Sequence, residues 1–249
     1  MLVLITGASS GIGAACARRF AKDGARLALW ARRRDRLDAV AKELGGAAHV
    51  ATVDVRDRGA VDAATKELVG KVGVPDVLLN NAGLAAGLDL VHEGDPDDWD
   101  RMIDTNVKGL LYVTRALLPH MVKRGTGHVV NLGSTAGHLV YPKGNVYNAS
   151  KFAVRALTEG INLDVAGTAI RVSSVDPGMV EGTEFSEVRF HGDDKKAAAV
   201  YRGLTPLTPN DVADAIAYIV SRPPHVNIVD LVLYPTAQRN AYVVDRRQD

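Results

Sequence analysis

The first thirteen residues combine a short apolar run with a glycine-rich turn. Residues 2–5 are too few for a helix, and their composition favours a buried parallel strand. They lead directly into residues 6–13, where glycines stand at positions 7, 11 and 13, and a helix is predicted to follow at residues 14–23. Glycines let the backbone approach a pyrophosphate, and a helix N-terminus offers unpaired N–H groups. This order therefore predicts the beginning of a dinucleotide-binding α/β fold.

Strand-like and helix-like segments alternate along the rest of the chain. Further strands are predicted at residues 26–30, 48–53, 76–80, 128–132, 169–175 and 229–233, and helices at 35–44, 60–71, 146–165 and 210–221. Residues 96–123 carry apolar side chains at helical spacing. Such alternation implies right-handed crossovers. We therefore expect one α/β domain over residues 1–249, a Rossmann-type doubly wound parallel β-sheet with helices on both faces.

Tyr147 and Lys151 stand four residues apart in a predicted helix, so they lie on the same helix face. A nearby cation favours the phenolate, so this spacing predicts a tyrosine pKa below its ordinary value of about 10. Such a phenol can take or give the proton of an alcohol. Ser134 ends a predicted strand and could hold the same substrate oxygen.

Four motifs each follow a predicted strand, at Gly7, Asn80, Ser134 and Pro177. In open α/β sheets, ligands bind beyond the carboxyl ends of the strands, near the point where strand order reverses. We therefore expect these motifs to meet at one edge of the sheet.

Together these motifs resemble the short-chain dehydrogenase/reductase family over nearly the whole chain. Besides residues 6–13 and 147–151, the family's Asn-Asn-Ala-Gly motif stands at residues 80–83. The family's helix asparagine, its serine and its Pro-Gly turn are matched by Asn106, Ser134 and Pro177-Gly178. The resemblance implies an NAD(P)-dependent oxidoreductase.

The resemblance also implies a role for each of four catalytic residues. Tyr147 would be the acid/base, and Lys151 would lower its pKa and hold the nicotinamide ribose. Ser134 would bind and orient the substrate oxygen, and Asn106 would support a water-linked proton relay.

The residues after the second predicted strand indicate the cofactor. NAD-preferring enzymes usually carry an acidic residue there, which accepts hydrogen bonds from the adenosine ribose. Ala31 stands here instead, and Arg32 and Arg33 could bind the 2′-phosphate of NADP through charge-assisted bonds. Asp54-Val55 resembles the family's adenine-contacting pair. The expected cofactor contacts are Gly7, Ser9, Ser10, Gly11, Ile12, Gly13, Arg32, Arg33, Asp54, Val55, Asn81, Ala82, Gly83, Tyr147, Lys151, Pro177, Gly178 and Val180.

The segments 144–147 and 177–193 further resemble the NADP-dependent 3-hydroxy acid dehydrogenases, a subgroup that includes serine and allo-threonine dehydrogenases. Gly182 makes the turn one residue longer than the wider family pattern, which favours this subgroup. The subgroup implies oxidation of L-serine, L-allo-threonine or 3-hydroxyisobutyrate, or reduction of a matching 3-oxo acid.

A 3-hydroxy or 3-oxo acid substrate needs a cation near its carboxylate. Arg189 is the candidate, with Ser134 and Tyr147 as the other substrate contacts, whereas Lys143 and Lys195 are weaker candidates. The connection at about residues 179–198 is long enough to be a cover over the substrate.

Composition and charge exclude several other classes of protein. Lys and Arg number 30 against 29 Asp and Glu, so nothing indicates a nucleic-acid or membrane partner. Apolar runs are far shorter than the roughly 18 residues of a membrane span. The single Cys16 suits a cytoplasmic protein, and seven singly placed histidines suggest no metal site. Family resemblance implies a homotetramer, because the long helices containing Asn106 and Tyr147 commonly form family interfaces.

Two alternative functions stay open. The first is an NADPH-dependent carbonyl reductase of uncharged ketones, which would not require a substrate carboxylate for turnover. The second is a non-catalytic NADP-binding regulatory protein. The presence of all four catalytic residues argues against the second.

Overall fold

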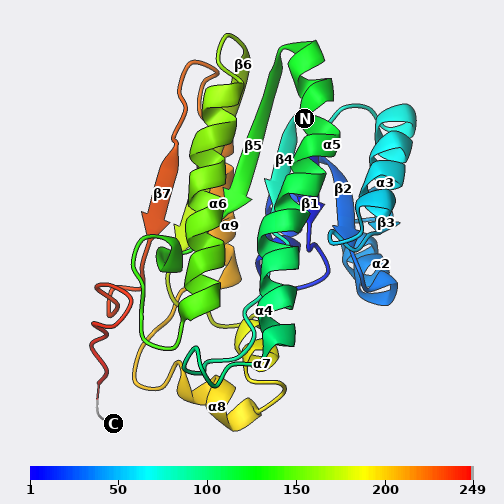
Figure 1. Cartoon of the computed structure of the whole chain (residues 1–249). Helices are drawn as coiled ribbons and strands as arrows, with labels where there is room; N and C mark the ends of the chain where they lie inside the picture. Colours follow the sequence, from blue (N-terminus) through cyan, green and yellow to red (C-terminus); the bar gives the residue numbers. More distant parts are fainter. Residues whose placement is uncertain (248–249) are drawn as a thin grey trace.

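Seven parallel strands form one sheet in the computed structural model, which describes residues 1–247 (Figure 1). The strands are β1 (Leu2–Thr6), β2 (Arg26–Ala31), β3 (His49–Thr52), β4 (Val77–Asn80), β5 (Thr126–Leu132), β6 (Ala169–Pro177) and β7 (Asp230–Leu233). Their order in space is β3-β2-β1-β4-β5-β6-β7, and every pairing is parallel. The predicted Rossmann-type doubly wound sheet is confirmed.

The helices fill the connections between the strands. They are α1 (Gly11–Lys22), α2 (Arg34–Glu43), α3 (Arg58–Lys71), α4 (Pro96–Ile103), the π-helical η1 (Asp104–Gly109), α5 (Leu110–Arg124), the 3₁₀ turn η2 (Thr135–Gly137), α6 (Asn145–Asp164), α7 (Phe185–Arg189), α8 (Asp194–Ala199) and α9 (Pro209–Val220). Each predicted strand and each predicted helix outside residues 96–123 is present, with its ends displaced by no more than three residues.

The helical segment predicted at residues 96–123 is not one regular α-helix. α4 and α5 are separated by η1, whose hydrogen bonds follow the wider π-helical pattern. Asn106 lies within this wider turn. Such turns often occur at functional sites. The spacing of apolar residues did not reveal the π turn, because it widens the helix without ending it.

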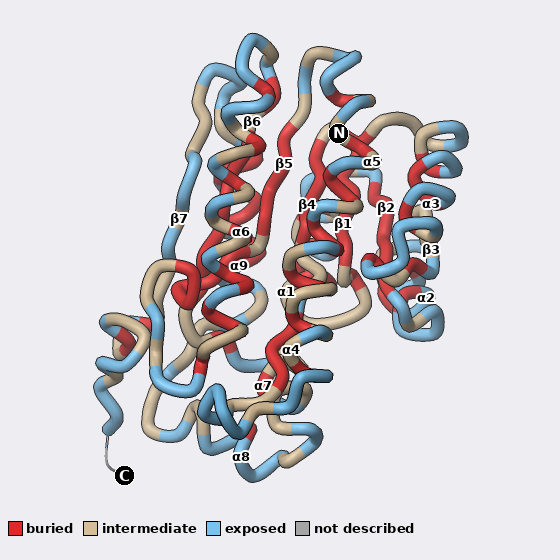
Figure 2. Tube along the Cα trace, in the orientation of Figure 1, coloured by how far each residue is buried: buried red, intermediate tan, exposed pale blue. Residues whose placement is uncertain are grey.

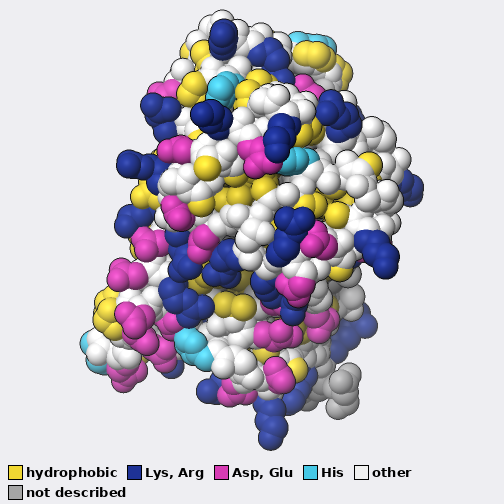
Figure 3. All heavy atoms as spheres, turned by 90° about the vertical axis from the view of Figure 1, so that its right-hand side faces the viewer, with side chains coloured by type: hydrophobic (Ala, Val, Ile, Leu, Met, Phe, Trp, Pro, Cys, Tyr) yellow, Lys and Arg dark blue, Asp and Glu magenta, His cyan; other side chains and the backbone are white. Residues whose placement is uncertain are grey.

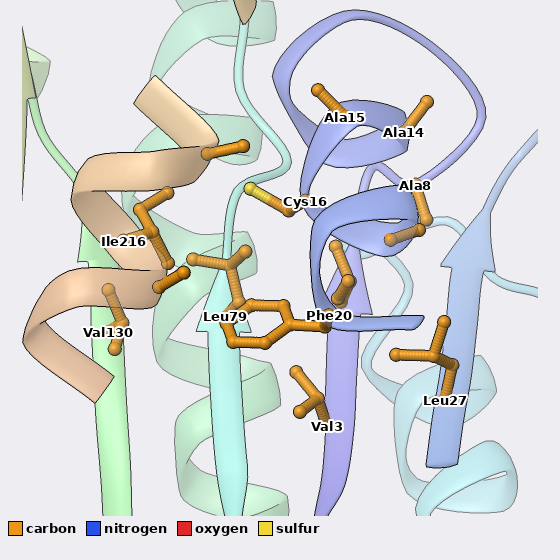
Figure 4. Packing of buried hydrophobic residues seen from close by; sticks show 14 of the residues in the cluster. Val3, Ala8, Ala14, Ala15, Cys16, Phe20, Leu27, Leu79, Val130 and Ile216 are labelled. Carbon is orange, nitrogen blue, oxygen red and sulfur yellow. The ribbon is translucent and has the colours of Figure 1, made fainter. Parts of the chain in front are cut away.

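Helices pack on both faces of the sheet, so there are two hydrophobic cores. On one face, Cys16 and Phe20 of α1 and Ile216 of α9 pack over strand residues such as Leu79 (Figure 4). Cys16 is a packing residue, and burial raises the pKa of its thiol. On the other face α3, α5 and α6 pack over strand residues that include Trp30. The inner strands β1 and β4 are buried throughout, whereas β7 lies at the partly exposed edge (Figure 2).

The strand order reverses between β1 and β4, and this reversal determines where a ligand can bind. β1 pairs with β2 on one side and β4 on the other, so the chain segments that follow β1 and β4 diverge. α7 and α8 lie beyond the carboxyl ends of the strands (Figure 1). The structure therefore places α7 and α8 at the same edge as the reversal of strand order.

The outer surface carries charges of both signs. Basic and acidic side chains are intermixed over the face that includes α2 and α3 (Figure 3). Among residues 1–247, no helix combines the length and the apolar character needed to cross a membrane.

The core on the α1 and α9 face should be sensitive to loss of volume. Ile216 is fully buried, so Ile216→Ala should lower the free energy of unfolding by about 2–5 kcal/mol through lost burial and the remaining cavity. Val91→Ala removes apolar atoms from a side chain that is 61% exposed and should change it by less than about 0.5 kcal/mol. Urea titration at one protein concentration measures both changes. Equal effects of the two substitutions would contradict this assignment of the core.

Candidate active site

A cavity of about 470 Å³ lies at the carboxyl edge of the sheet. It is lined by the turn after β1 and by the ends of β2, β4, β5 and β6, together with residues of α6 and α7. The predicted site residues on its wall are Gly7, Ser9, Ser10, Gly11, Ile12, Arg32, Arg33, Asp54, Val55, Asn81, Ala82, Gly83, Ser134, Tyr147, Lys151, Pro177, Gly178, Val180 and Arg189. Gly13 and Asn106 lie behind this wall.

The turn after β1 depends on glycine for backbone conformation and for close packing. Gly7 and Gly11 have φ angles of +66° and +51°, which L side chains rarely adopt. A Cβ atom on Gly13 would lie 2.3 Å from the carbonyl oxygen of Gly7, so only glycine fits there. Asn81 donates from Nδ2 to the carbonyl oxygens of Thr6, at 2.8 Å, and Gly7, at 3.2 Å. These contacts leave an open backbone cradle of the shape that a pyrophosphate needs.

The end of the cavity beside β2 is predicted to hold the adenosine of the cofactor and is called the adenosine end. It carries two arginines with different surroundings. Ala31 offers no carboxylate, and Arg32 lines the cavity without a hydrogen bond to any side chain among residues 1–247. Arg33 donates to both carboxylate oxygens of Glu184, at 2.9 and 2.5 Å, and to Ser10 Oγ at 3.1 Å. Both predicted phosphate-binding arginines therefore reach the cavity, but a carboxylate already engages Arg33.

Asp54 and Val55 border the same end of the cavity. Arg56 donates to both carboxylate oxygens of Asp54, including Nη2 to Oδ2 at 2.7 Å. This pairing lowers the pKa of Asp54 and fixes the direction of its carboxylate. A Cβ atom on Gly109 would lie 2.7 Å from Val55 Cγ2, so η1 packs closely against Val55.

The side chains predicted to be catalytic come from α6 and from the chain after β5. Tyr147 and Lys151 lie on the cavity side of α6, and Ser134 caps the short turn η2. Lys151 donates from Nζ to the carbonyl oxygen of Leu132 at 2.8 Å, which joins α6 to β5. Ser134 Oγ accepts a hydrogen bond from the backbone N–H of Ala136 at 3.1 Å. The three predicted residues therefore converge on one region of the cavity.

The charge states of Tyr147 and Lys151 are determined mainly by burial. Burial raises the pKa of the Tyr147 phenol, while the nearby Ser134 hydroxyl and the positive charge of Arg189 lower it. Burial also lowers the pKa of Lys151 to about 8, against the opposing charge of Asp176. The net direction for Tyr147 is opposite to the lowering predicted from the Tyr147–Lys151 spacing. Helical spacing showed that the two groups share a face but not how deeply both are buried.

Arg189 lies beside the phenol of Tyr147. Its guanidinium carbon is 5.5 Å from the centroids of the Tyr147 and Tyr141 rings. It donates to the Tyr141 hydroxyl at 2.9 Å and to the carbonyl oxygen of Gly87 at 3.3 Å. Phe185 packs its ring against Tyr147, with centroids 5.5 Å apart and planes at 63°. A cation and the predicted acid/base group therefore lie side by side in the cavity.

The two lysines named as weaker candidates for binding the substrate carboxylate lie away from the cavity. Lys143 and Lys195 are exposed and do not line the cavity.

Asn106 accepts from the N–H of Leu84 at 2.9 Å, and it donates to the Leu84 carbonyl oxygen at 2.8 Å and to Ser150 Oγ at 3.0 Å. These bonds tie η1 to the chain after β4 and to α6, the helix that carries Tyr147.

Several residues on the cavity wall had no role in the sequence analysis. Gln238 accepts at Oε1 from the N–H of Met179 at 2.8 Å, and Tyr141 holds Arg189. Neither residue stands in a recognisable local pattern, because each reaches the cavity only through tertiary folding. Glu184 did carry a signal, since it follows the extra Gly182 in the segment that resembles the 3-hydroxy acid subgroup.

A cluster of possible metal ligands consists of His138, Asp176 and Asp230. The sequence did not predict it, because the histidines are scattered singly along the chain. Their possible ligand atoms lie within 4.8 Å of one another. Arg155, which can only donate, lies 3.2 Å from His138 Nδ1, and His138 Nε2 lies 3.1 Å from an oxygen of Asp176. His138 therefore accepts at Nδ1 and donates from Nε2. Hydrogen bonds within the protein therefore explain the cluster. Neither ring nitrogen of His138 has a free lone pair with which to bind a metal.

Comparison with known proteins gives matches over the full fold. A protein from Salmonella typhi named NADP-dependent 3-hydroxy acid dehydrogenase is 47% identical over 238 residues, 96% of each chain. Sulfoacetaldehyde reductase 2 from Chromohalobacter salexigens is 47% identical over 249 residues, 98% of each chain. The solved closed form of a serine dehydrogenase complexed with NADP⁺ matches with a TM-score of 0.95 and 45% identity, and the match covers 100% of both chains.

The family model described as short chain dehydrogenase matches residues 1–194, which include the glycine-rich turn and the four residues predicted to be catalytic. With this match, the relatives above and the arrangement of Ser134, Tyr147 and Lys151 around one cavity, the chain belongs to the short-chain dehydrogenase family.

Proposed function

We propose that the protein is an NADP-dependent oxidoreductase of small 3-hydroxy acids. It would oxidise the 3-hydroxyl of compounds such as L-serine, L-allo-threonine or 3-hydroxyisobutyrate, or reduce the matching 3-oxo acids. The observation that carries this proposal is the guanidinium of Arg189, 5.5 Å from the ring centroid of Tyr147. It offers a partner for a carboxylate beside the acid/base group. The names of the Salmonella relative and of the serine dehydrogenase support the same substrate class.

The cavity fits the NADP that we propose as cofactor. The cradle formed by Gly7, Gly11 and Gly13 suits the pyrophosphate, and the absence of an acidic residue at Ala31, beside Arg32, suits the 2′-phosphate. The NADP⁺ in the serine dehydrogenase complex supports this choice. NADP supplies the two-electron redox chemistry when it is bound.

The protein's own groups would bind, orient and exchange a proton with the substrate. Ser134 Oγ would hold the reacting oxygen, and Tyr147 would give its phenolic proton to that oxygen during reduction or take it during oxidation. Lys151 would hold the ribose, and Asn106 would support the proton relay, as the family resemblance implies. Because burial raises the pKa of Tyr147, the surrounding protein groups favour the neutral phenol, which is the proton donor in reduction.

The cover, the assembly and the location are further parts of the proposal. Residues 179–198 would cover the substrate, supported by α7 on the cavity wall. Residues 1–249 would form one domain, of which residues 248 and 249 lie outside the described part. A homotetramer is supported by exposed apolar side chains such as Leu111 on α5 and Leu163 on α6. A cytoplasmic location fits the buried free thiol of Cys16.

A second candidate function is the reduction of an aldehyde that carries a sulfonate. The Chromohalobacter relative is named a sulfoacetaldehyde reductase, and the Arg189 guanidinium could pair with a sulfonate as well as with a carboxylate. Both candidate functions use the same proposed catalytic residues, and they differ only in the anionic group of the substrate. Comparing sulfoacetaldehyde with malonic semialdehyde, which has a carboxylate in its place, distinguishes them by kcat/KM.

Removing the phenolic hydroxyl should remove most of the activity. Tyr147→Phe keeps the ring packed against Phe185 but cannot transfer a proton, so kcat should fall by roughly 10²–10⁴-fold. NADP binding, measured by titration calorimetry, should change little. For the unmodified enzyme, the rate of oxidation should rise with pH as the phenol ionises. A folded Tyr147→Phe variant with nearly full kcat would end this mechanism.

The adenosine end should select NADP over NAD. Ala31→Asp should weaken NADP by placing a carboxylate against the 2′-phosphate, and Arg32→Ala by removing a counter-charge, each by about tenfold or more. Arg34→Ala is a matched control, because Arg34 points to Asp38 on the surface of α2. The measurement is kcat/KM with each cofactor. A higher kcat/KM with NAD than with NADP in the unmodified enzyme would refute this cofactor assignment.

Arg189 should recognise the negative charge of the substrate. Arg189→Ala should lower kcat/KM for a 3-hydroxy acid on the order of ten- to a hundredfold relative to an uncharged alcohol of similar size. Arg189→Lys should restore only part, because lysine lacks the planar pair of donors. The ratio of the two kcat/KM values cancels general damage to folding or cofactor binding. An unchanged ratio would remove Arg189 from the substrate site and favour the uncharged-ketone alternative.

A further inference from the structure

Glu184 joins the cover of the cavity to the groups at its adenosine end. Arg33 donates to its Oε1 at 2.9 Å and to its Oε2 at 2.5 Å, Ser10 Oγ donates to Oε2 at 2.8 Å, and Arg36 also contacts Oε1. A Cβ atom on Gly11 would lie 3.2 Å from the side chain of Thr183, so this part of the chain sits directly on the glycine-rich turn. The carboxylate thus holds residues 183–184 against the cofactor cradle through four hydrogen bonds.

The same carboxylate stands at the N-terminal cap of α7, whose other end carries Arg189. α7 is a single short helical stretch, Phe185–Arg189, so fewer than two helical turns separate Glu184 from Arg189. Phe185 packs on Tyr147, and the carbonyl oxygen of Arg189 accepts from the N–H of Gly87 at 3.0 Å. α7 therefore spans from Arg33 at the adenosine end to the predicted carboxylate site beside Tyr147.

The ion pair at the start of α7 keeps Glu184 charged but remains partly exposed to solvent. The hydrogen bonds from Arg33 lower the pKa of Glu184 to about 2, so its carboxylate stays charged at neutral pH. The side chains of Glu184 and Arg33 remain 30% and 41% exposed, so water and salt weaken the pair. Arg33 uses both terminal nitrogens to contact this carboxylate, whereas Arg32 lies on the cavity wall without a hydrogen bond to another side chain among residues 1–247.

We propose that Glu184 is a positioning residue, which holds α7 on Arg33 and Arg36 and thereby places Arg189 for the substrate anion. The inference rests on the proposed function, because it assumes that Arg189 binds that anion. One side chain would then link the adenosine end of the cavity to recognition of the substrate charge. Glu184 makes no hydrogen bond with Tyr147 among residues 1–247, and we expect its effect on recognition of the substrate charge to pass through α7 and Arg189.

Hydrogen exchange in the cofactor-free protein tests the first half of the proposal without any activity measurement. Glu184→Gln keeps the size of the side chain but removes its charge. Amides held by α7 bonds, such as those of Val188, Phe190 and Gly192, should then exchange about two- to fivefold faster, the range expected for a partly exposed ion pair. Glu187→Gln is the matched control, because Glu187 is an exposed acid on the same helix. Glu184→Asp, which keeps the charge, should fall between the unmodified protein and Glu184→Gln.

A double-mutant cycle tests the second half. The measured quantity is the ratio of kcat/KM for a 3-hydroxy acid to that for an uncharged alcohol of similar size, with NADP. Glu184→Gln should lower this ratio about three- to tenfold in the otherwise unmodified enzyme and should not lower it further in the Arg189→Ala variant. Non-additivity of this kind is expected only if Glu184 acts through Arg189.

Three outcomes would overturn the proposal. The first is unchanged exchange of residues 186–192 in Glu184→Gln, and the second is an equal drop of the ratio with and without Arg189. The third is tighter NADP binding by Glu184→Gln with unchanged exchange, which would make Glu184 a competitor of the 2′-phosphate for Arg33. Failure of the proposed function itself is distinct, because it would show as absent NADP-dependent turnover of 3-hydroxy acids by the unmodified enzyme.

Discussion

The common direction of the strands within residues 1–247 is the constraint on which the site depends. Because every strand is parallel, the residues that follow β1, β4, β5 and β6 all leave the sheet at one edge. The reversal of strand order between β1 and β4 then opens the crevice at that edge. Right-handed crossovers place helices on both faces, and the two hydrophobic cores hold the strand ends rigid. Residues that are far apart in the sequence consequently meet within one cavity.

At the end of the cavity near Tyr147, burial and the charge of Arg189 shift the pKa of the phenol in opposite directions. Desolvation raises the pKa of the Tyr147 phenol and lowers that of Lys151 to about 8, so both groups are pushed toward their neutral forms. Arg189 opposes this effect at the phenol, because its guanidinium lies beside the ring. The apolar contact of Phe185 and the hydrogen bond from Arg189 to Tyr141 keep that charge in place. The arginine proposed to bind the substrate anion therefore also lowers the pKa of the tyrosine.

The segment between β6 and α9 is held from several directions. Gln238 accepts from the N–H of Met179 near the start of this segment. Near α8, Arg246 donates from Nη2 to the carbonyl oxygen of Val200 at 2.9 Å and also contacts that of Arg202. Glu184 anchors the middle of the segment on Arg33. These contacts give α7 a defined position over the cavity, because a five-residue helix has little stability of its own.

The sequence by itself was sufficient to predict the parallel α/β fold, the glycine-rich turn and the convergence of Ser134, Tyr147 and Lys151 on one cavity. Those features depend on local spacing and on the rule that parallel strands end at one edge. Only the tertiary structure showed the π-helical turn around Asn106, the deep burial that raises the pKa of Tyr147, and the pairing of Arg33 with Glu184. Arg33 and Glu184 are 151 residues apart, so no local pattern connects them. The pKa shift likewise follows from packing, because desolvation depends on the side chains that the whole fold assembles around a group.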